Sequence, residues 1–454
     1  MLEDIAVDTL VHSSSGTVVM RRFQGLLTAP SWQTFPSLAC GWAVATDRHT
    51  LTTSLWLTGA TAVQHLSRFS LFLGCPLYQQ RWPLWGAVIR LAAPFVPAGE
   101  VIRVSCDDTT KQKAGTHIEG LARYRHGAGA ARQAYRTLRG VHCVLGLMPM
   151  PLTRWPGHAR SVPRGCALSR TAPHAQTRHV PYQARSQLAR ALLDCVAEQV
   201  PGRPIRRCAD GGDATKDSVR RWPEAVHVVG AFAHQRHALR GAATPPPHAS
   251  RCPTQKRRPD RRAQDPGPDR HGVVAPPPSA AGAERQAWDG LWHAVLPGRL
   301  VRVVVLRRPG NRALKQPRQS TPPPAIDAFF TTALSLSAQD MVREYSVRWA
   351  VDIALRDANA FAGLGQAQCR KHQRLMGANT LRLVMAAART LWCIEQVERG
   401  TAGPLCRYRP WSRQQVAPRQ LDVAEACREA LHEAGIFPIP RFTPELAEND
   451  EEPE

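Results

Sequence analysis

Several motifs with well-defined chemistry are absent from this sequence. None of the twelve cysteines belongs to a C-x-x-C pair, which argues against a zinc ribbon or a thioredoxin-like redox centre. No glycine-rich loop is followed by Lys-Ser or Lys-Thr, so we expect no nucleotide cofactor and no ATP-driven activity. No Ser-His or Cys-His arrangement has a diagnostic local context either. Catalytic side chains are therefore best sought among the carboxylates.

Long apolar runs are also lacking. The most apolar stretch, residues 83–99, is interrupted by Arg90, Pro94 and Pro97, and it is too short to cross a bilayer. The first ten residues carry acids and no apolar run, so no secretory signal is expected. These features predict a cytoplasmic protein without a membrane partner, whose thiols remain reduced.

Acidic residues are scarce relative to basic ones. The chain has 59 Lys and Arg against 36 Asp and Glu, a formal net charge of +23, and most of the basic residues are arginine. Such an excess is typical of proteins that bind a polyanion, most often nucleic acid. Arginine makes bidentate contacts with phosphate and guanine. A GC-rich coding bias is an alternative source of arginine, alanine and proline.

The beginning of the chain, residues 1–95, is expected to be mostly helical. Residues 48–74 combine a Thr/Ser-rich start, an apolar face and a central Gly59. This pattern is typical of a helix-turn-helix, which would place His65 and Arg68 on a DNA-binding second helix. An ordinary pair of packed helices is the alternative.

The next region alternates between strand and helix patterns. Ile102, Val104 and Cys106 alternate with polar residues, the period of a strand with one buried face. A helix is expected from an N-capping Ser186, and residues 154–178 are expected to form a loop. Further strands are predicted near residues 117–125, 142–150, 204–210, 225–232 and 301–306. This order predicts a mixed α/β fold.

Residues 245–284 differ from the rest of the chain, because they contain no Leu, Ile, Phe, Met, Trp or Tyr. Such a segment cannot bury enough apolar surface to fold by itself, so we expect residues 245–285 to be disordered or weakly ordered. Helices are predicted again at residues 344–359 and 380–400.

Acidic residues at strand ends are the candidate catalytic groups. Asp107 and Asp108 follow the first predicted strand, and Asp210 follows a later one before two glycines. Asp352 lies on the helix at 344–359, where Tyr345, Arg348, Asp352 and Asn359 fall within roughly 60° of one another. Converging carboxylates suit Mg²⁺ or Mn²⁺, and two such ions would support phosphodiester chemistry. Turns, helix caps and local ion pairs are the structural alternatives for each acid.

These residues resemble a known family, the DDE transposases of bacterial insertion sequences, in the group marked by a Tyr-Arg-Glu-Lys helix. The spacing of that motif is intact at Tyr345, Arg348, Asp352 and Asn359. Asp-Asp-Thr at 107–109 resembles the first catalytic aspartate of the family, and Asp-Gly-Gly-x-Ala at 210–214 the second. The similarity runs with interruptions from about residue 22 to 412.

The resemblance implies a ribonuclease-H-like mixed sheet flanked by helices, formed by residues 96–235 and 335–398. It implies a mainly β insertion at 236–334, after the candidate DNA-binding region 1–95 and before a C-terminal tail region, 399–454. The protein would be associated with the bacterial nucleoid. It would cut double-stranded DNA at insertion-sequence ends and join them to a target, with Mg²⁺ or Mn²⁺, as a homodimer.

In this scheme Asp108, Asp210 and Asp352 hold the metal ions, with Asp107 as the alternative to Asp108, because the family aspartate directly precedes the threonine. Tyr345, Arg348 and Asn359 would contact DNA phosphates. Trp288 or Trp292 would stack on a flipped base, although a core role is the simpler interpretation of both.

Two positions depart from the family pattern. The family glutamate is Asp352 here, one methylene shorter, and catalytic groups need placement within roughly 0.5 Å. The family lysine is Asn359, which removes a positive charge. These changes are typical of a decayed copy. The alternatives are therefore an inactive relative that only occupies transposon-end DNA, and a different metal nuclease of ribonuclease-H-like fold.

Overall fold

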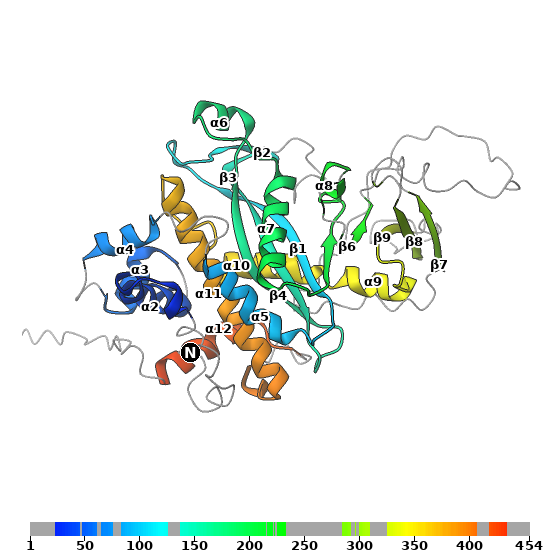
Figure 1. Ribbon diagram of the computed structural model, residues 1–454. Helices are drawn as coiled ribbons and strands as arrows, with labels where there is room; N and C mark the ends of the chain where they lie inside the picture. The colour runs from blue at the N-terminus through cyan, green and yellow to red at the C-terminus, as the bar shows by residue number, and fades with distance from the viewer. Residues whose placement is uncertain are drawn as a thin grey trace, which may run out of the picture.

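The fold is described from a computed structural model. The residues it describes are 23–45, 48–60, 65–75, 83–125, 137–214, 216–220, 222, 225–232, 284–291, 296, 299–308, 325–405 and 417–433. The predicted α/β class is confirmed, because a mixed, mostly antiparallel open sheet is flanked by helices (Figure 1). No helix within these ranges is both long enough and apolar enough to cross a bilayer.

The sheet has the strand order β2-β3-β1-β5-β6-β9-β8-β7, and β4 pairs with β3 outside this path. β1 pairs antiparallel with β3 and parallel with β5, and β5 pairs parallel with β6. The strands are β1 (Ile102–Gln112), β2 (Ala122–Arg125), β3 (Thr137–Pro151), β4 (Ala159–Ser169), β5 (Ile205–Ala209), β6 (Val226–Ala231), β7 (Glu284–Leu291), β8 (Leu300–Arg308) and β9 (Ala325–Thr331).

The helices gather around the β1–β6 part of the sheet. They are α2 (Ala29–Val44), α3 (Leu51–Leu57), α4 (Leu66–Leu73), α5 (Pro83–Ala92), α6 (Ala172–Thr177), α7 (Arg185–Gln199), α8 (Lys216–Arg220), α9 (Ala338–Ser346), α10 (Trp349–Phe361), α11 (His372–Arg399) and α12 (Gln420–Glu433). Short 3-10 turns occur at Gln24–Leu26, Ala93–Phe95 and Gly403–Leu405.

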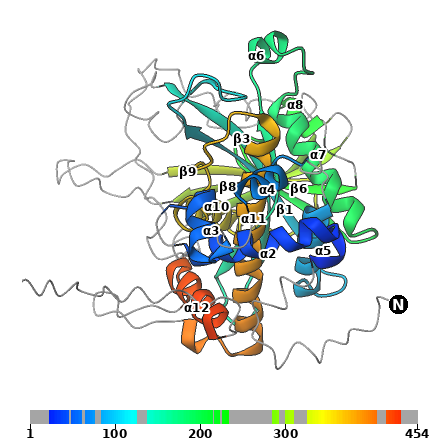
Figure 2. The ribbon, with the colours of Figure 1, turned by 90° about the vertical axis from the view of Figure 1, so that its left-hand side faces the viewer.

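The long helix α11 organises the main core. It packs against β4 on one side and against α2, α4, α5 and α12 on others, so most of its length is buried. Figure 2 shows α12 lying beside one end of α11. One contiguous apolar cluster extends from Phe35 on α2 through Val104 on β1 to Val423 on α12, and it therefore joins the N-terminal helices to the sheet.

Several predicted elements need correction. Residues 154–178 were expected to be a loop, yet they contain β4. The Arg164 side chain of this strand is buried, and its guanidinium donates hydrogen bonds to the carbonyls of Leu147 and Leu192. Ser186 does not cap α7, because the N-cap is Ala184. β1 is buried on both faces in its first half, since Ser105 is 1% exposed and donates to the carbonyl of Cys208.

The helix expected at 344–359 is two helices. α9 ends at Ser346 and α10 begins at Trp349, with Val347 and Arg348 in the turn between them. Arg348 keeps αR backbone angles, so the direction of the chain changes little and the predicted stripe is only slightly disturbed. The ten described cysteines are free thiols.

Candidate acidic active site

The register of two parallel strands aligns the first two acids. Val104 of β1 is the partner of Arg207 of β5, so three residues further along each strand come Asp107 and Asp210. Adjacent strands lie about 4.8 Å apart, which places both aspartates at the same level where β5 ends. Asp210 Oδ1 accepts a hydrogen bond from the amide of Asp213 at 2.6 Å, and this turn holds the Asp-Gly-Gly loop.

A buried ion triad positions α9 over this edge. Glu344 accepts hydrogen bonds from Arg103 of β1 at 2.5 and 2.9 Å and lies 3.0 Å from Arg206 of β5. Burial opposes ionisation, but the two guanidinium groups lower the pKa of the Glu344 carboxyl. The triad therefore ties the start of the Tyr345–Asn359 stripe to the strands that carry Asp107 and Asp210.

Asp352 lies in the first turn of α10, facing Asp107. Burial and the carboxylates of Asp352 and Asp210 together raise the pKa of Asp107 to about 7. Burial and Asp210 also raise the pKa of Asp352, against the opposing effect of Arg348. The neighbouring Asp107 carboxyl opposes this rise in the pKa of Asp352. Three carboxylates from β1, the end of β5 and α10 thus act on one another electrostatically.

Asp108 lies on the other face of β1. Its carboxylate pairs with Arg185 at the start of α7 and lies 3.3 Å from Nε2 of His142. Burial opposes the shift, but His142 and Arg185 lower the pKa of Asp108. His142 in turn is hydrogen-bonded to Thr110 at 2.7 Å and stacks on Tyr124. The geometry thus groups Asp107, the alternative, with Asp210 and Asp352, and leaves Asp108 outside the cluster.

Arg348 and Tyr345 border the three acids. The Arg348 guanidinium lies 3.4 Å from Asp352 Oδ2, and its carbon lies 5.6 Å from the Tyr345 ring centroid and 5.1 Å from that of Trp349. Burial disfavours the charged guanidinium of Arg348, but Tyr345 and the three carboxylates outweigh this effect and raise its pKa. Its side chain is only 10% exposed.

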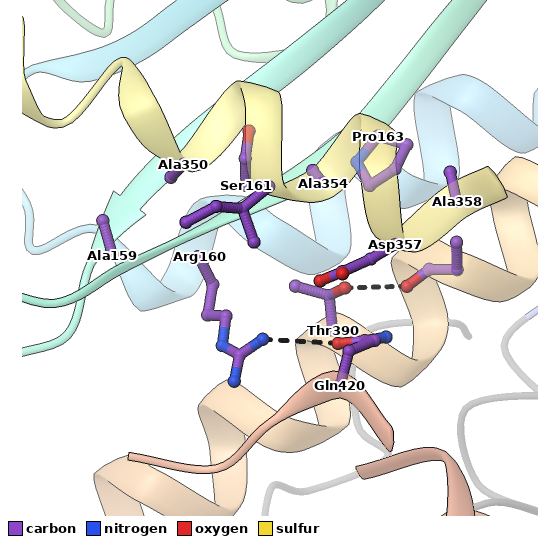
Figure 3. A pocket seen from close by; sticks show the side chains of 12 residues that line it. Ala159, Arg160, Ser161, Pro163, Ala350, Ala354, Asp357, Ala358, Thr390 and Gln420 are labelled. Atoms are coloured by element: carbon purple, nitrogen blue, oxygen red, sulfur yellow. Dashed lines mark hydrogen bonds between the residues drawn. The ribbon is translucent and has the colours of Figure 1, made fainter. Parts of the chain in front are cut away.

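The opposite face of α10 is lined with small residues. Ala350, Ala354 and Ala358 border a cavity of about 20 Å³ between α10, β4 and α11, and Arg160 closes it by donating to Gln420 at 3.3 Å (Figure 3). This space holds about one water molecule. Asn359 is partly buried, and its Oδ1 is enclosed without a hydrogen-bond partner in the described structure.

The residues predicted to bind DNA from the N-terminal helices have structural contacts. His65 caps α4 by accepting from the amide of Ser67 at 3.2 Å. Arg68 donates to Gln33 Oε1 at 2.5 Å and to the carbonyl of Pro30. Trp292 lies outside the described residues, and for Trp288 only the backbone position in β7 is described.

Comparisons with known proteins identify no relative of this chain. No family model matches the chain, and a search of the curated proteins finds none with significant similarity. The residues of the site are therefore the main indication of what the protein does.

The donor set of the site suits a hard divalent cation, because carboxylate oxygens are the ligands of Mg²⁺ and Mn²⁺. Burial and, after it, the neighbouring carboxylates of Asp352 and Asp210 raise the pKa of Asp107, and a cation would offset both effects. Among the described residues, however, no three His, Cys, Asp or Glu side chains gather closely enough to hold one ion as placed. The chemistry of the residues fits the metal, although their present spacing is looser than a coordination sphere.

Sequence reasoning missed the residues that support the site. Arg103 was assigned to the polar face of a half-buried strand, and Arg206 and Glu344 were not assigned any role. The only available signal was the position of Glu344 directly before Tyr345 in the motif. A buried ion triad between two strands and a helix cannot be recognised from spacing alone.

Proposed function

We propose that this protein cuts and joins DNA by metal-dependent phosphodiester chemistry, as a DDE-type transposase. The observation that carries the proposal is the convergence of Asp107, Asp210 and Asp352 from three separate elements, where burial and the two neighbouring carboxylates raise the pKa of Asp107 to about 7. Strongly perturbed carboxyl groups cluster at functional sites. The net charge of +23 supports a DNA partner.

The fold supports the same proposal. In a ribonuclease-H-like core the acids lie on and beside a mixed sheet, and here β1 is the central strand, with antiparallel β3 on one side and parallel β5 on the other. β7, β8 and β9 extend the sheet beyond β6, and they correspond to the β insertion that the resemblance implies. The homodimer on paired DNA ends belongs to this proposal as well.

The roles of the residues follow from their positions. Asp107, Asp210 and Asp352 would hold Mg²⁺ or Mn²⁺ through carboxylate oxygens. The ions, when bound, would activate a water or a DNA hydroxyl and stabilise the leaving oxygen of the broken phosphodiester. Asp107 must lose its proton before it can serve as a ligand. Glu344 holds the helix that carries Asp352 against the strands that carry the other two acids.

A nicking assay on supercoiled plasmid DNA with Mn²⁺ tests the proposal, because β1 offers a matched pair of variants. We expect Asp107→Asn to lower metal-dependent nicking at least ~100-fold, about 3 kcal/mol of lost transition-state stabilisation. Asp108→Asn, one residue away on the other face, should retain most activity. If Asp108→Asn abolished nicking and Asp107→Asn did not, the assignment of the site would be wrong.

A second function, DNA binding without cleavage, is favoured by two specific observations. The carboxylates are spaced too widely to hold one ion as placed, and Asp352 and Asn359 stand where the family has glutamate and lysine. Asp352→Glu adds one methylene and restores the glutamate of the family motif. Nicking by Asp352→Glu alone, with none by the natural sequence, would establish the inactive DNA-binding role. Nicking by the natural sequence would exclude that role.

A further inference from the structure

The guanidinium of Arg348 lies among the acids rather than at the surface. Arg348 as a whole residue is 8% exposed. Its guanidinium lies 3.4 Å from Asp352 Oδ2, and Asp210 and Asp107 also act on it electrostatically. Its Nε is enclosed without a hydrogen-bond partner in the described structure. A side chain held in this way is poorly placed to reach the phosphates of a DNA duplex.

The surroundings hold Arg348 in position. The guanidinium carbon lies over the rings of Tyr345 and Trp349, 5.6 Å and 5.1 Å from their centroids, and cation–π contacts of this kind are attractive. The Tyr345 ring packs against Phe329 of β9, with 4.7 Å between ring centroids. The turn that bears Arg348 follows Glu344, which the ion triad fixes to β1 and β5.

Arg348 offsets only part of the negative charge of the cluster. Three partly buried carboxylates act on one guanidinium, which leaves two negative charges when all three are ionised, and one divalent cation would neutralise them. Arg207 also acts on Asp210, but its own salt bridge to Asp213 neutralises it. Unpartnered charges with limited access to water are strongly destabilising, so the cluster depends on Arg348, which is paired with Asp352.

We propose that Arg348 is the resident counter-ion of the Asp107–Asp210–Asp352 cluster, a positioning residue that keeps the three carboxylates together before a divalent cation arrives. This inference rests on the proposed function for its choice of site. Arg348 and the metal ion then act on the same carboxylates, and the guanidinium supplies part of the positive charge that the site requires.

The test is a double-mutant cycle on the full chain in EDTA at pH 8, without DNA, read by thermal melting. We expect Arg348→Gln to lower the melting temperature by about 3 °C or more, and Arg348→Lys, which keeps the charge, to lower it much less. Asp107→Asn in the Arg348→Gln background should restore most of the loss, because it removes the uncompensated charge. Arg343→Gln, which breaks an exposed pair with Asp340, is the control and should change little.

Two outcomes would overturn the inference. Arg348→Lys could be as damaging as Arg348→Gln, which would assign the role to ring stacking rather than charge. Alternatively, the changes in melting temperature caused by Asp107→Asn and by Arg348→Gln could simply add in the double variant, which would show that the two side chains do not interact. If Arg348→Gln does not fold, recovery of a cooperative melting transition in the double variant supports the inference, and its absence contradicts it. No metal or DNA is present, so this result is distinguishable from the outcome of the nicking assay.

Discussion

At the residue scale, two consecutive aspartates have opposite surroundings. Asp107 faces Asp352 and Asp210, which raise its pKa to about 7 together with burial. Asp108 faces His142 and Arg185, which lower its pKa. The alternation of side chains along β1 alone separates the two. Sequence spacing could not choose between them, because both directly follow an apolar strand pattern.

The raised pKa of Asp107 predicts a pH dependence of stability in metal-free protein. The folded state holds the Asp107 proton up to about pH 7, whereas the unfolded chain loses it near 3.8, the ordinary pKa of an aspartate. The folded state thus binds more protons, and stability should fall as pH rises from 4 to 7. The contribution of this group is about 4 kcal/mol at most.

Urea denaturation in EDTA at several pH values checks this prediction against Asp107→Asn, which lacks the titrating group. The difference in unfolding free energy between the natural protein and the variant should change steadily over this range. A constant difference would show that Asp107 has an ordinary pKa. Added Mn²⁺ should reduce the pH dependence between pH 4 and 7, because a bound cation favours the ionised carboxylate.

At the scale of elements, α9 and α10 depend on Glu344. Its side chain is 12% exposed and is paired with Arg103 and Arg206. Glu344→Gln leaves two buried guanidinium groups without a carboxylate, so we expect a loss of about 3 kcal/mol in unfolding free energy. The carboxylate of Asp352 should also move relative to Asp107, which should weaken any Mn²⁺-dependent nicking.

Glu395→Gln is the matched control for this variant. It removes the same functional group from an i,i+4 pair with Arg399 on α11, remote from the acids. Pairs of this kind contribute less than about 1 kcal/mol. Chemical denaturation compares the two variants, and equal losses would show that the Glu344 triad has no special part in holding α9.

Much of the element order could be predicted from sequence, because apolar periodicity marks β1, β5, β6, β8, α7 and α11. β4 was missed, since Arg160, Pro163 and Arg164 disrupt its apolar pattern, and only the structure shows Arg164 satisfied by backbone carbonyls. The break near Arg348 was missed for another reason. No proline or glycine marks it, and tertiary contacts of Glu344 and Tyr345 fix the local geometry there.

At the scale of the whole molecule, the charge of +23 dominates. We expect binding to any DNA duplex to weaken steeply with salt, at least about tenfold between 50 and 200 mM, because each phosphate contact releases counterions. Filter binding or fluorescence anisotropy with a duplex of arbitrary sequence measures the slope. Affinity that does not change with salt would contradict a phosphate-dominated interface. This measurement does not distinguish the active enzyme from the inactive DNA binder.

Asp107 and Asp210 precede the long stretch of chain between β6 and β9, and Arg348 and Asp352 follow it. β6 and β9 are hydrogen-bonded neighbours, with Val229 opposite Thr331, so the two ends of this stretch meet in the sheet. The entropy of closing a loop grows only with the logarithm of its length. Insertions and deletions between these strands therefore cost little free energy, and they leave the spatial arrangement of Asp107, Asp210 and Asp352 unchanged.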